Sequence, residues 1–313
     1  MVFFARRLLH LVPALVVIAV VAFFLIRVAG GDPTALLLPQ DASQEDIDRM
    51  RQEFGLDQPL LVQFAVWTAD LVRGDLGMSY YTRAPVLATI VDRAYPTLWL
   101  AVFAQLLAIV IAIPAGVVSA VRQNTLIDKL FTVFALGGVA IPNFWFAMML
   151  VMLFSINLGW LPSQGFVDPL VDPWQGTRRL ILPSVALGYL QVGLITRMTR
   201  SAMLDVLRLD YVRTGRAKGL PERAVIGRHA LATAMGPIVT VIGLSMASLF
   251  TGAVVTELVF NYPGLGQLIV EAVGRRDFPL IQGVLIVLAV ITLLVNFLVD
   301  LSYGVFDPRI RYE

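Results

Sequence analysis

The 313-residue sequence has no cysteine and only two histidines, His10 and His229. The lack of thiols excludes disulfides, thiol catalysis and thiolate metal sites. The histidines are far apart in the sequence and neither belongs to a His-Glu-x-x-His pattern, so we expect no metal site. The sequence also lacks a Gly-x-x-x-x-Gly-Lys-Ser/Thr phosphate-binding loop, which argues against ATP binding by this chain.

Charged residues are scarce, at 15% of the sequence compared with about a quarter in an ordinary soluble domain. Hydrophobic residues make up 58% of the chain. A soluble protein of this composition would have too little polar surface, so the lipid bilayer must solvate much of the chain. The net charge of +2 is too small to indicate a nucleic-acid partner.

Six apolar stretches are long enough, or nearly so, to cross about 30 Å of hydrocarbon at about 1.5 Å per residue. A spanning segment must satisfy its own backbone hydrogen bonds, which favours helices over strands. The sequence therefore predicts an all-α integral membrane protein with six transmembrane helices in contact with membrane lipid. The shortest span ends at Arg197 and Arg200, whose side chains can reach the headgroups. The predicted spans are 8–26, 98–121, 130–156, 180–196, 233–256 and 280–302.

The first stretch, 8–26, follows Arg6 and Arg7 and in this respect resembles a secretory signal peptide. At 19 residues it is longer than the hydrophobic region of such a peptide, and no small-x-small cleavage site follows it. We therefore favour a retained first span over a cleaved signal.

The distribution of Lys and Arg along the chain indicates its orientation. With a cytoplasmic N-terminus, the inside segments hold 14 Lys/Arg in 62 residues and the outside segments hold 10 in 117 residues. This asymmetry agrees with the positive-inside rule, so both termini are predicted to be cytoplasmic. The inside segments are 1–7, 122–129, 197–232 and 303–313, and the outside segments are 27–97, 157–179 and 257–279.

The outside segment 27–97 is too long for a bare loop and carries helical patterns. Three helices are predicted in it, because capping and helix-ending residues flank amphipathic runs. They run from Ser43 to Gly55, from Pro59 to Gly74, and from Pro85 to about Ala94, before Pro96. We expect a helical extracytoplasmic cap between the first two spans. Two interpretations of this cap stay open: packing over the spans, or a docking surface.

Prolines inside the predicted spans include Pro114, Pro142 and Pro183. A proline inside a helix removes a backbone donor and can kink the helix. Neighbouring helices could equally absorb each of them, and spacing alone does not distinguish the two outcomes.

Charged side chains are nearly absent from the spans, with Asp300 in the last turns of the sixth and Glu257 just past the outer end of the fifth. Ionisable residues at mid-membrane mark proton and ion pathways, so their absence argues against a proton-coupled carrier. A Na⁺ site can be built from neutral oxygens. An ion-coupled secondary transporter therefore stays open as the alternative class.

A basic segment, 197–232, separates the fourth and fifth spans and holds eight Lys/Arg and three acidic residues. Asp210 is suited to cap a short helix, Gly219 to end it, and Pro221 to start the next. Such a helix–turn–helix could seat in a groove of a soluble partner. It could also be a solvated basic loop, and spacing leaves both interpretations open.

This segment resembles the coupling loop of ABC-importer permeases, whose loose signature is Glu-Ala-Ala, three residues, Gly, nine residues, Ile-x-Leu-Pro. Gly219 and Leu231 match it. The departures are Arg213, Thr214 and Gly215 in place of Glu-Ala-Ala, His229 in place of Ile, and Ala232 in place of Pro. The di-/oligopeptide branch typically has Asp-Tyr-x-Arg-Thr-Ala-Arg-Ala-Lys-Gly here, and residues 210–219 depart from that only at Gly215.

The resemblance to this branch extends along nearly the whole chain, and the long outer cap and Arg-Ile ending are similar to the first of its two permease subunits. The matching motifs are Gly31-Asp32-Pro33, Gly55-Leu56-Asp57-Gln58-Pro59, Gly74-Asp75-Leu76-Gly77, Pro96-Thr97-Leu98, Arg197-Met198-Thr199-Arg200-Ser201, Tyr262-Pro263-Gly264-Leu265-Gly266, Arg276-Asp277-Phe278-Pro279 and Asp307-Pro308-Arg309-Ile310.

The resemblance implies a multi-pass subunit of the bacterial cytoplasmic (inner) membrane that is not itself an enzyme. Its partners would be a second, related permease subunit, two ATP-binding cassette ATPases that use ATP and Mg, and an extracytoplasmic solute-binding protein. The branch transports dipeptides, oligopeptides, glutathione or nickel chelates by alternating access. Within the coupling loop, 205–232, the residues implied to contact the ATPase are Asp210, Tyr211, Arg213, Thr214, Arg216, Ala217, Lys218, Gly219, Leu220 and Glu222.

Two further classes are less consistent with the sequence. A membrane-embedded enzyme would need a nucleophile–base pair or metal ligands, and none is found. An exporter-type ABC chain would usually carry its own phosphate-binding loop or longer cytoplasmic helices. The residues that line the solute pathway are not identifiable from the sequence.

Overall fold

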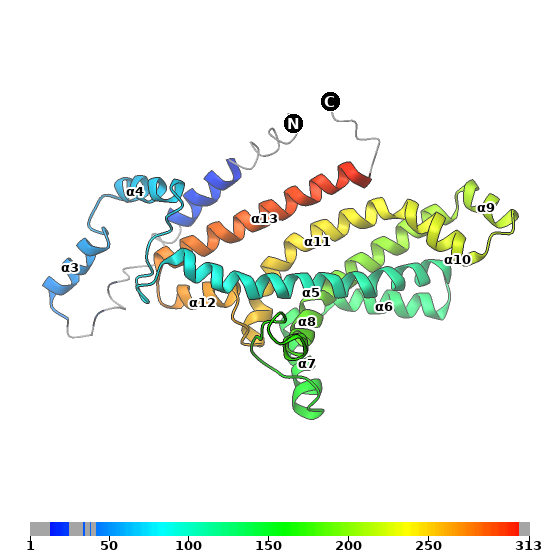
Figure 1. Ribbon diagram of the computed structural model, residues 1–313, viewed down its shortest axis with the longest axis horizontal. Coiled ribbons are helices and arrows are strands. Elements are labelled where there is room, and N and C mark those ends of the chain that lie inside the picture. The colour runs from blue at the N-terminus through cyan, green and yellow to red at the C-terminus, as the bar shows by residue number, and fades with distance from the viewer. Residues whose placement is uncertain (1–12, 25–33, 35–37, 39–41, 307–313) are drawn as a thin grey trace. The chain divides into compact units, whose positions relative to one another are not determined.

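The computed structural model describes residues 13–24, 34, 38 and 42–306, and this part of the chain is helical with no β-strand (Figure 1). The predicted all-α class is confirmed. The labelled helices are α3 (Gln44–Glu53), α4 (Leu60–Val72), α5 (Val86–Val121), α6 (Leu126–Ala140), α7 (Asn143–Leu150), the π-helix η1 (Val151–Asn157), α8 (Pro173–Leu207), α9 (Asp210–Ala217), α10 (Glu222–Ala224), the π-helix η2 (Val225–Ala230), α11 (Leu231–Val259), α12 (Leu265–Gly274) and α13 (Phe278–Phe306).

Several of these helices are long and apolar enough to cross a membrane. Within the described residues there are four, and up to five if the bent pair α6 and α7–η1 forms one span. The first predicted span, 8–26, lies partly outside the described residues, and its described part is a helix at Pro13–Phe24. The chain is therefore a multi-pass membrane protein, and the number six stays a prediction. The four are Val86–Val121, Pro173–Leu207, Glu222–Val259 and Phe278–Val299.

The predicted helix boundary at Pro96 is wrong. The segment expected as a third, separate cap helix is the first part of α5, which continues through Pro96 and Pro114. A proline removes only one backbone donor from a helix, so packing can preserve the rest. Here the buried Tyr262 hydroxyl donates a hydrogen bond to the Pro96 carbonyl oxygen at 3.0 Å, which helps to hold the helix at this point.

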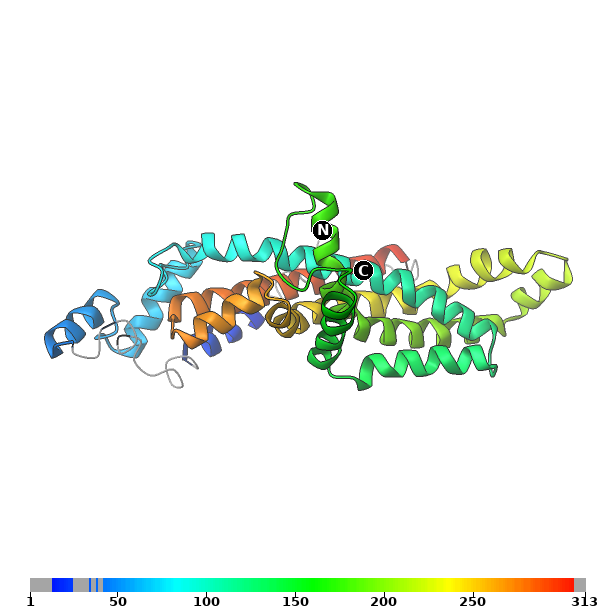
Figure 2. The same ribbon diagram turned by 90° about the horizontal axis from the view of Figure 1, so that it is seen from below.

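The predicted span 130–156 is also wrong as a single helix. Helix α6 ends at Ala140, and the following helical segment, 143–157, is bent from it by 110° (Figure 2). Ile141 has extended backbone angles of φ −87° and ψ 126°, which are those favoured for a residue before proline. Pro142 is the N-cap of α7, where its missing N–H is no loss. Pro183, in contrast, lies inside the continuous helix α8.

The chain divides into two compact units, Met1–Tyr95 with Pro263–Leu293 and Pro96–Tyr262 with Leu294–Glu313. The core of the first unit consists of apolar residues from the start of α5, from α12 and from the start of α13. The backbone approaches closely at Gly283, where an added Cβ would lie 2.6 Å from a Val86 methyl group. The fully buried members of this core include Val86, Ile90, Leu265 and Val284.

The segment before α5 in the first unit contains two of the predicted cap helices, α3 and α4. Ser43 is the N-cap of α3, as predicted, and it also forms a capping box with Asp46. The carboxylate of Asp277 is buried and accepts hydrogen bonds from the Ser79 hydroxyl and, at 3.1 Å, from the Tyr80 backbone N–H. This pairing fixes the turn before α5 to the start of α13.

The core of the second unit joins α5, α8 and α11 around small residues such as Ala108, Ala112 and Ala234. Small side chains let transmembrane helices approach closely. At Gly188 on α8, an added Cβ would lie 2.8 Å from the Ala104 carbonyl oxygen of α5. Larger residues would separate these helices, so their packing depends on small residues at the contact.

Candidate coupling site

The segment between α8 and α11 forms a compact projection at the ends of these two helices (Figure 1). The chain leaves α8, forms the short helix α9, turns, and enters α10 and the π-helix η2, which lead directly into α11. Val212, Val225 and Ala230 anchor the projection in the core of the second unit, with at most 1% of their surface exposed. Its other side chains are exposed at least in part and are available to a partner.

Helix α9 begins with a different cap from the one that the sequence predicts. Leu209, with φ −72° and ψ 147°, is the N-cap, and its side chain gives no capping hydrogen bond. Asp210 is the first helical residue, so its expected role as N-cap is wrong. A carboxylate in the first turn still interacts favourably with the helix dipole. The Asp210 carboxylate also lies 3.7 Å from the Arg213 guanidinium.

Helix α9 ends in a Schellman turn centred on Gly219. The Gly219 N–H donates to the Arg216 carbonyl at 2.9 Å, and the Leu220 N–H donates to the Gly215 carbonyl at 3.2 Å. Gly219 has φ +76°, a conformation that glycine adopts readily and other residues do not. The Leu220 side chain packs over Gly215, where an added Cβ would lie 3.5 Å from it.

An ion pair crosses the turn from α9 to α10. The Arg216 guanidinium donates to both carboxylate oxygens of Glu222, at 2.7 and 3.2 Å. Both side chains are about half exposed, so the pair contributes little to stability. Pro221 is the N-cap of α10. Tyr211 connects α9 to α11 by donating a hydrogen bond to the Thr233 hydroxyl at 2.9 Å.

The ten residues implied as ATPase contacts all lie in this projection and are solvent-exposed. A hollow of about 260 Å³ lies between α9 and η2, bordered by Tyr211, Gly215, Leu220 and His229 among others. Helix α9 is short and amphipathic, and side-chain hydrogen bonds connect it to α10 and α11. The projection follows the end of α8 in the chain and leads directly into α11 through η2.

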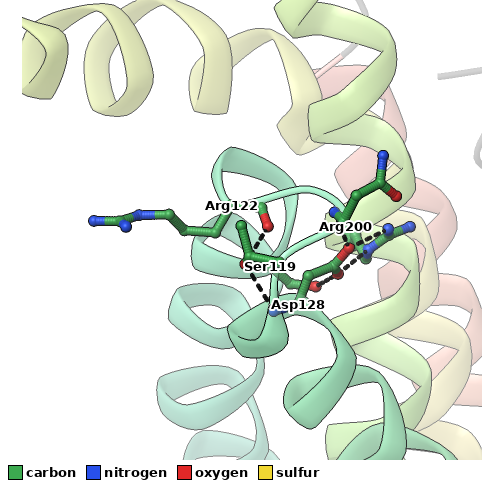
Figure 3. A network of polar contacts seen from close by, with 6 residues as sticks. Ser119, Arg122, Asp128 and Arg200 are labelled. Carbon is green, nitrogen blue, oxygen red and sulfur yellow. Dashed lines mark hydrogen bonds and ion pairs between the residues drawn. The ribbon is translucent and has the colours of Figure 1, made fainter.

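A second polar cluster near these helices is not apparent from the sequence. The Asp128 carboxylate at the start of α6 accepts two hydrogen bonds from the Arg200 guanidinium of α8, at 2.7 and 2.8 Å. It also accepts from the Ser119 hydroxyl of α5 and from the Asn124 backbone N–H at 2.9 Å. Figure 3 shows Asp128 between Ser119 and Arg200. This clasp joins three helices of the second unit.

One sequence signal did mark Asp128. Thr125 is the N-cap of α6 and accepts a hydrogen bond from the Asp128 N–H, so the acid stands at the third helical position of a capping motif. That motif predicts a helix start but not a partner 72 positions along the chain. Among the described residues, no group of three or more His, Asp or Glu side chains is placed to hold a metal ion.

Comparison with known proteins identifies close relatives. The chain is 41% identical to the dipeptide transport system permease protein DppB of Alkalihalophilus pseudofirmus, with 98% of each chain covered. It is 40% identical to the glutathione transport system permease protein GsiC of Escherichia coli (strain K12), again with 98% of each covered. A probable peptide ABC transporter permease protein of Sinorhizobium fredii is 40% identical, with 99% of each covered.

The fold is similar to that of a solved transporter chain. A chain of the MetNI methionine ABC transporter in an inward-facing conformation aligns with a TM-score of 0.58 at 18% identity, covering 71% of this chain and 97% of that one. The family described as "Binding-protein-dependent transport system inner membrane component" matches residues 112–312, and the family of the corresponding N-terminal component matches residues 1–101. The chain therefore belongs to the binding-protein-dependent transport system inner membrane component family.

Proposed function

We propose that this chain transports peptides or glutathione as one permease subunit of an ABC importer in a bacterial inner membrane. The observation that carries the proposal is the identity of about 40% along nearly the whole chain to permeases named for dipeptide, glutathione and peptide transport. The chain is a permease subunit of an ABC importer, and ATP hydrolysis belongs to partner subunits. Only the identity of the transported solute goes beyond this assignment.

The proposed topology has six spans, both termini in the cytoplasm and the segment 27–97 outside. The concentration of Lys and Arg in the short inside segments supports it. The projection formed by α9 and α10 would then face the cytoplasm, where ATPase subunits bind ATP.

The proposed assembly contains a second, related permease subunit, two ATPases that use ATP and Mg, and an extracytoplasmic solute-binding protein. The family itself implies a partner ATPase and a binding protein. In the proposed mechanism α9 sits in a groove of the ATPase, ATP-driven closure moves the projection, and α8 and α11 move with it to open the pathway outward. The Schellman turn at Gly219 and the hydrogen bond from Tyr211 to Thr233 support this role because they connect α9 to the turn and to α11.

The test is transport by the purified assembly in vesicles. We expect uptake of labelled dialanine or glutathione that requires ATP, the binding protein and all four membrane and ATPase subunits. Uptake by this chain alone, driven by a Na⁺ or proton gradient and indifferent to ATP, would instead identify an ion-coupled secondary transporter. ATP-driven uptake of neither solute would reject the proposed substrate class and leave the family assignment intact.

A further inference from the structure

A groove of about 550 Å³ lies between α8 and α11 in the second unit. From α8 it is bordered by Leu194, Arg197 and Ser201, and from α11 by Leu244, Ser245 and Ser248 among others. The lining thus combines apolar side chains with hydroxyls and one cation. Among the described residues that border the groove none is acidic, so it carries a net positive charge.

The cation in this groove differs from its neighbour on the same helix. Arg200 is neutralised by Asp128 through two hydrogen bonds. Arg197 is exposed, and in the part of the chain that the structure describes neither Arg197 nor Ser201 has a side-chain hydrogen-bond or ion-pair partner. They are four residues apart on α8, so their side chains lie on the same face one turn apart. The pair offers a cation and a hydroxyl to a ligand.

A row of polar side chains runs from the groove into the helix core. The buried Gln191 amide donates to the Ser248 hydroxyl at 2.9 Å, and the Ser245 hydroxyl contacts the Gln105 side-chain oxygen at 3.3 Å. Gln191 and Gln105 have 2% and 4% of their surface exposed, and each keeps one side-chain polar atom without a partner among the described residues. Such groups are costly between transmembrane helices and typically mark a substrate pathway.

We propose that this groove is a solute-binding station in the pathway, in which Arg197 and Ser201 hold the terminal carboxylate of a peptide while Leu194 and Leu244 contact its apolar side chain. The inference rests on the proposed function. A guanidinium is the residue of choice for binding a carboxylate through paired hydrogen bonds.

A lipid phosphate is a different source of negative charge for Arg197. The structure favours the solute, because Ser248 is exposed on α11 in the lining and the polar row behind it continues to α5. Ser248 lies inside the predicted span 233–256, where a surface that faces lipid would be apolar. The groove therefore has the properties of an aqueous path rather than of a headgroup contact.

The experiment uses the complete transporter in nanodiscs, after ATP-driven uptake by the wild type has been established. Met198→Cys, at a groove residue with no role in holding the carboxylate, is introduced into the naturally cysteine-free chain. The partner subunits in these complexes also lack reactive thiols, and the rate of labelling by a small thiol reagent is measured. L-alanyl-L-leucine at three times its Kd for the transporter should leave about a quarter of the grooves free. Labelling should therefore slow about fourfold. The C-terminal amide of this peptide should protect far less, because it lacks the carboxylate. A matched control, Gln164→Cys in an exposed loop, should be labelled at the same rate with and without peptide.

The role of Arg197 is tested in the same background. Arg197→Gln should abolish protection by the peptide, and Arg197→Lys, which keeps the charge and the fold, should retain part of it. The inference would be overturned if the peptide and its amide slowed labelling equally, or if neither slowed it in an active transporter. The proposed function would still stand in both cases. Labelling that slows only as the phosphatidylglycerol content of the nanodisc rises would assign Arg197 to lipid and also overturn it.

Discussion

At the scale of single residues, Gly219 combines two properties that make it a sharp probe of coupling. Its φ is +76°, yet nothing lies within 4 Å of the position that a Cβ would occupy. Gly219→Val therefore acts through backbone strain alone, at a local cost of about 1–3 kcal/mol. We expect an assembled complex with strongly reduced uptake and without stimulation of ATP hydrolysis by the loaded binding protein. Uptake, hydrolysis and subunit stoichiometry are the measurements.

Gly227 provides the matched control for this variant. It lies in η2, also has no atom within 4 Å of the place where a Cβ would be added, and does not have a positive φ. Gly227→Val should therefore leave uptake and stimulated hydrolysis much closer to those of the wild type. Equal effects of the two substitutions, or normal uptake by Gly219→Val, would show that the turn geometry is not needed for coupling.

Asp128 is the second residue whose role can be isolated. Its side chain is 5% exposed and accepts two hydrogen bonds from Arg200. Asp128→Asn leaves the guanidinium without its counter-charge, and breaking a buried pair in this way costs about 3 kcal/mol. Thermal unfolding of the purified complex should begin at a lower temperature. Asp205→Asn, at an exposed position of α8, is the control and should leave the unfolding transition unchanged. If Asp128→Asn and Asp205→Asn unfolded at the same temperature, the Asp128–Arg200 pair would not stabilise the protein.

At the scale of helices, α9 carries a glycine that its fold does not require. Gly215 lies in the helix, and an added Cβ would make ordinary contact with Leu220 at 3.5 Å. Alanine is favoured over glycine by about 1 kcal/mol in a helix, so Gly215→Ala should slow amide exchange in α9 about fivefold. Hydrogen exchange at the Lys218 amide, which donates to Thr214, measures this. Ala217→Gly should have the opposite effect, and faster exchange in Gly215→Ala would mean that the added methyl group clashes.

The helices also show which signals in the sequence are local. The cap at Ser43 and the left-handed Gly219 are predictable, because each depends on residues within one or two turns. Pro96 and Pro142 are equivalent as signals, yet one lies inside a helix and the other marks a bend of 110°. The difference comes from tertiary contacts, such as the hydrogen bond from Tyr262 to Pro96. No local pattern encodes that contact.

In the chain as a whole, local sequence predicts one part of the candidate site, whereas the other part depends on contacts between distant helices. The projection is contiguous in sequence, so residues 210–222 could be identified by their motif. The Asp128–Arg200 clasp and the groove at Arg197 combine residues from helices far apart in the chain. Periodicity predicts that these helices exist, but it does not predict which faces meet. The side chains that line the groove can therefore be identified only once the packing of α8 against α11 is known.

The orientation of the whole chain in the membrane can be tested because the sequence contains no cysteine. Gln52→Cys lies on the exposed surface of α3, and Arg223→Cys lies on the exposed surface of α10. With the proposed topology, a membrane-impermeant thiol reagent added to spheroplasts should label Gln52→Cys at once and Arg223→Cys only after the membrane is opened. Both substitutions are on surfaces without a packing role, so both variants should insert normally, which labelling after detergent treatment verifies. The reverse pattern would place the α9–α10 projection outside, where no ATPase could reach it, and would remove the physical basis for coupling through Gly219.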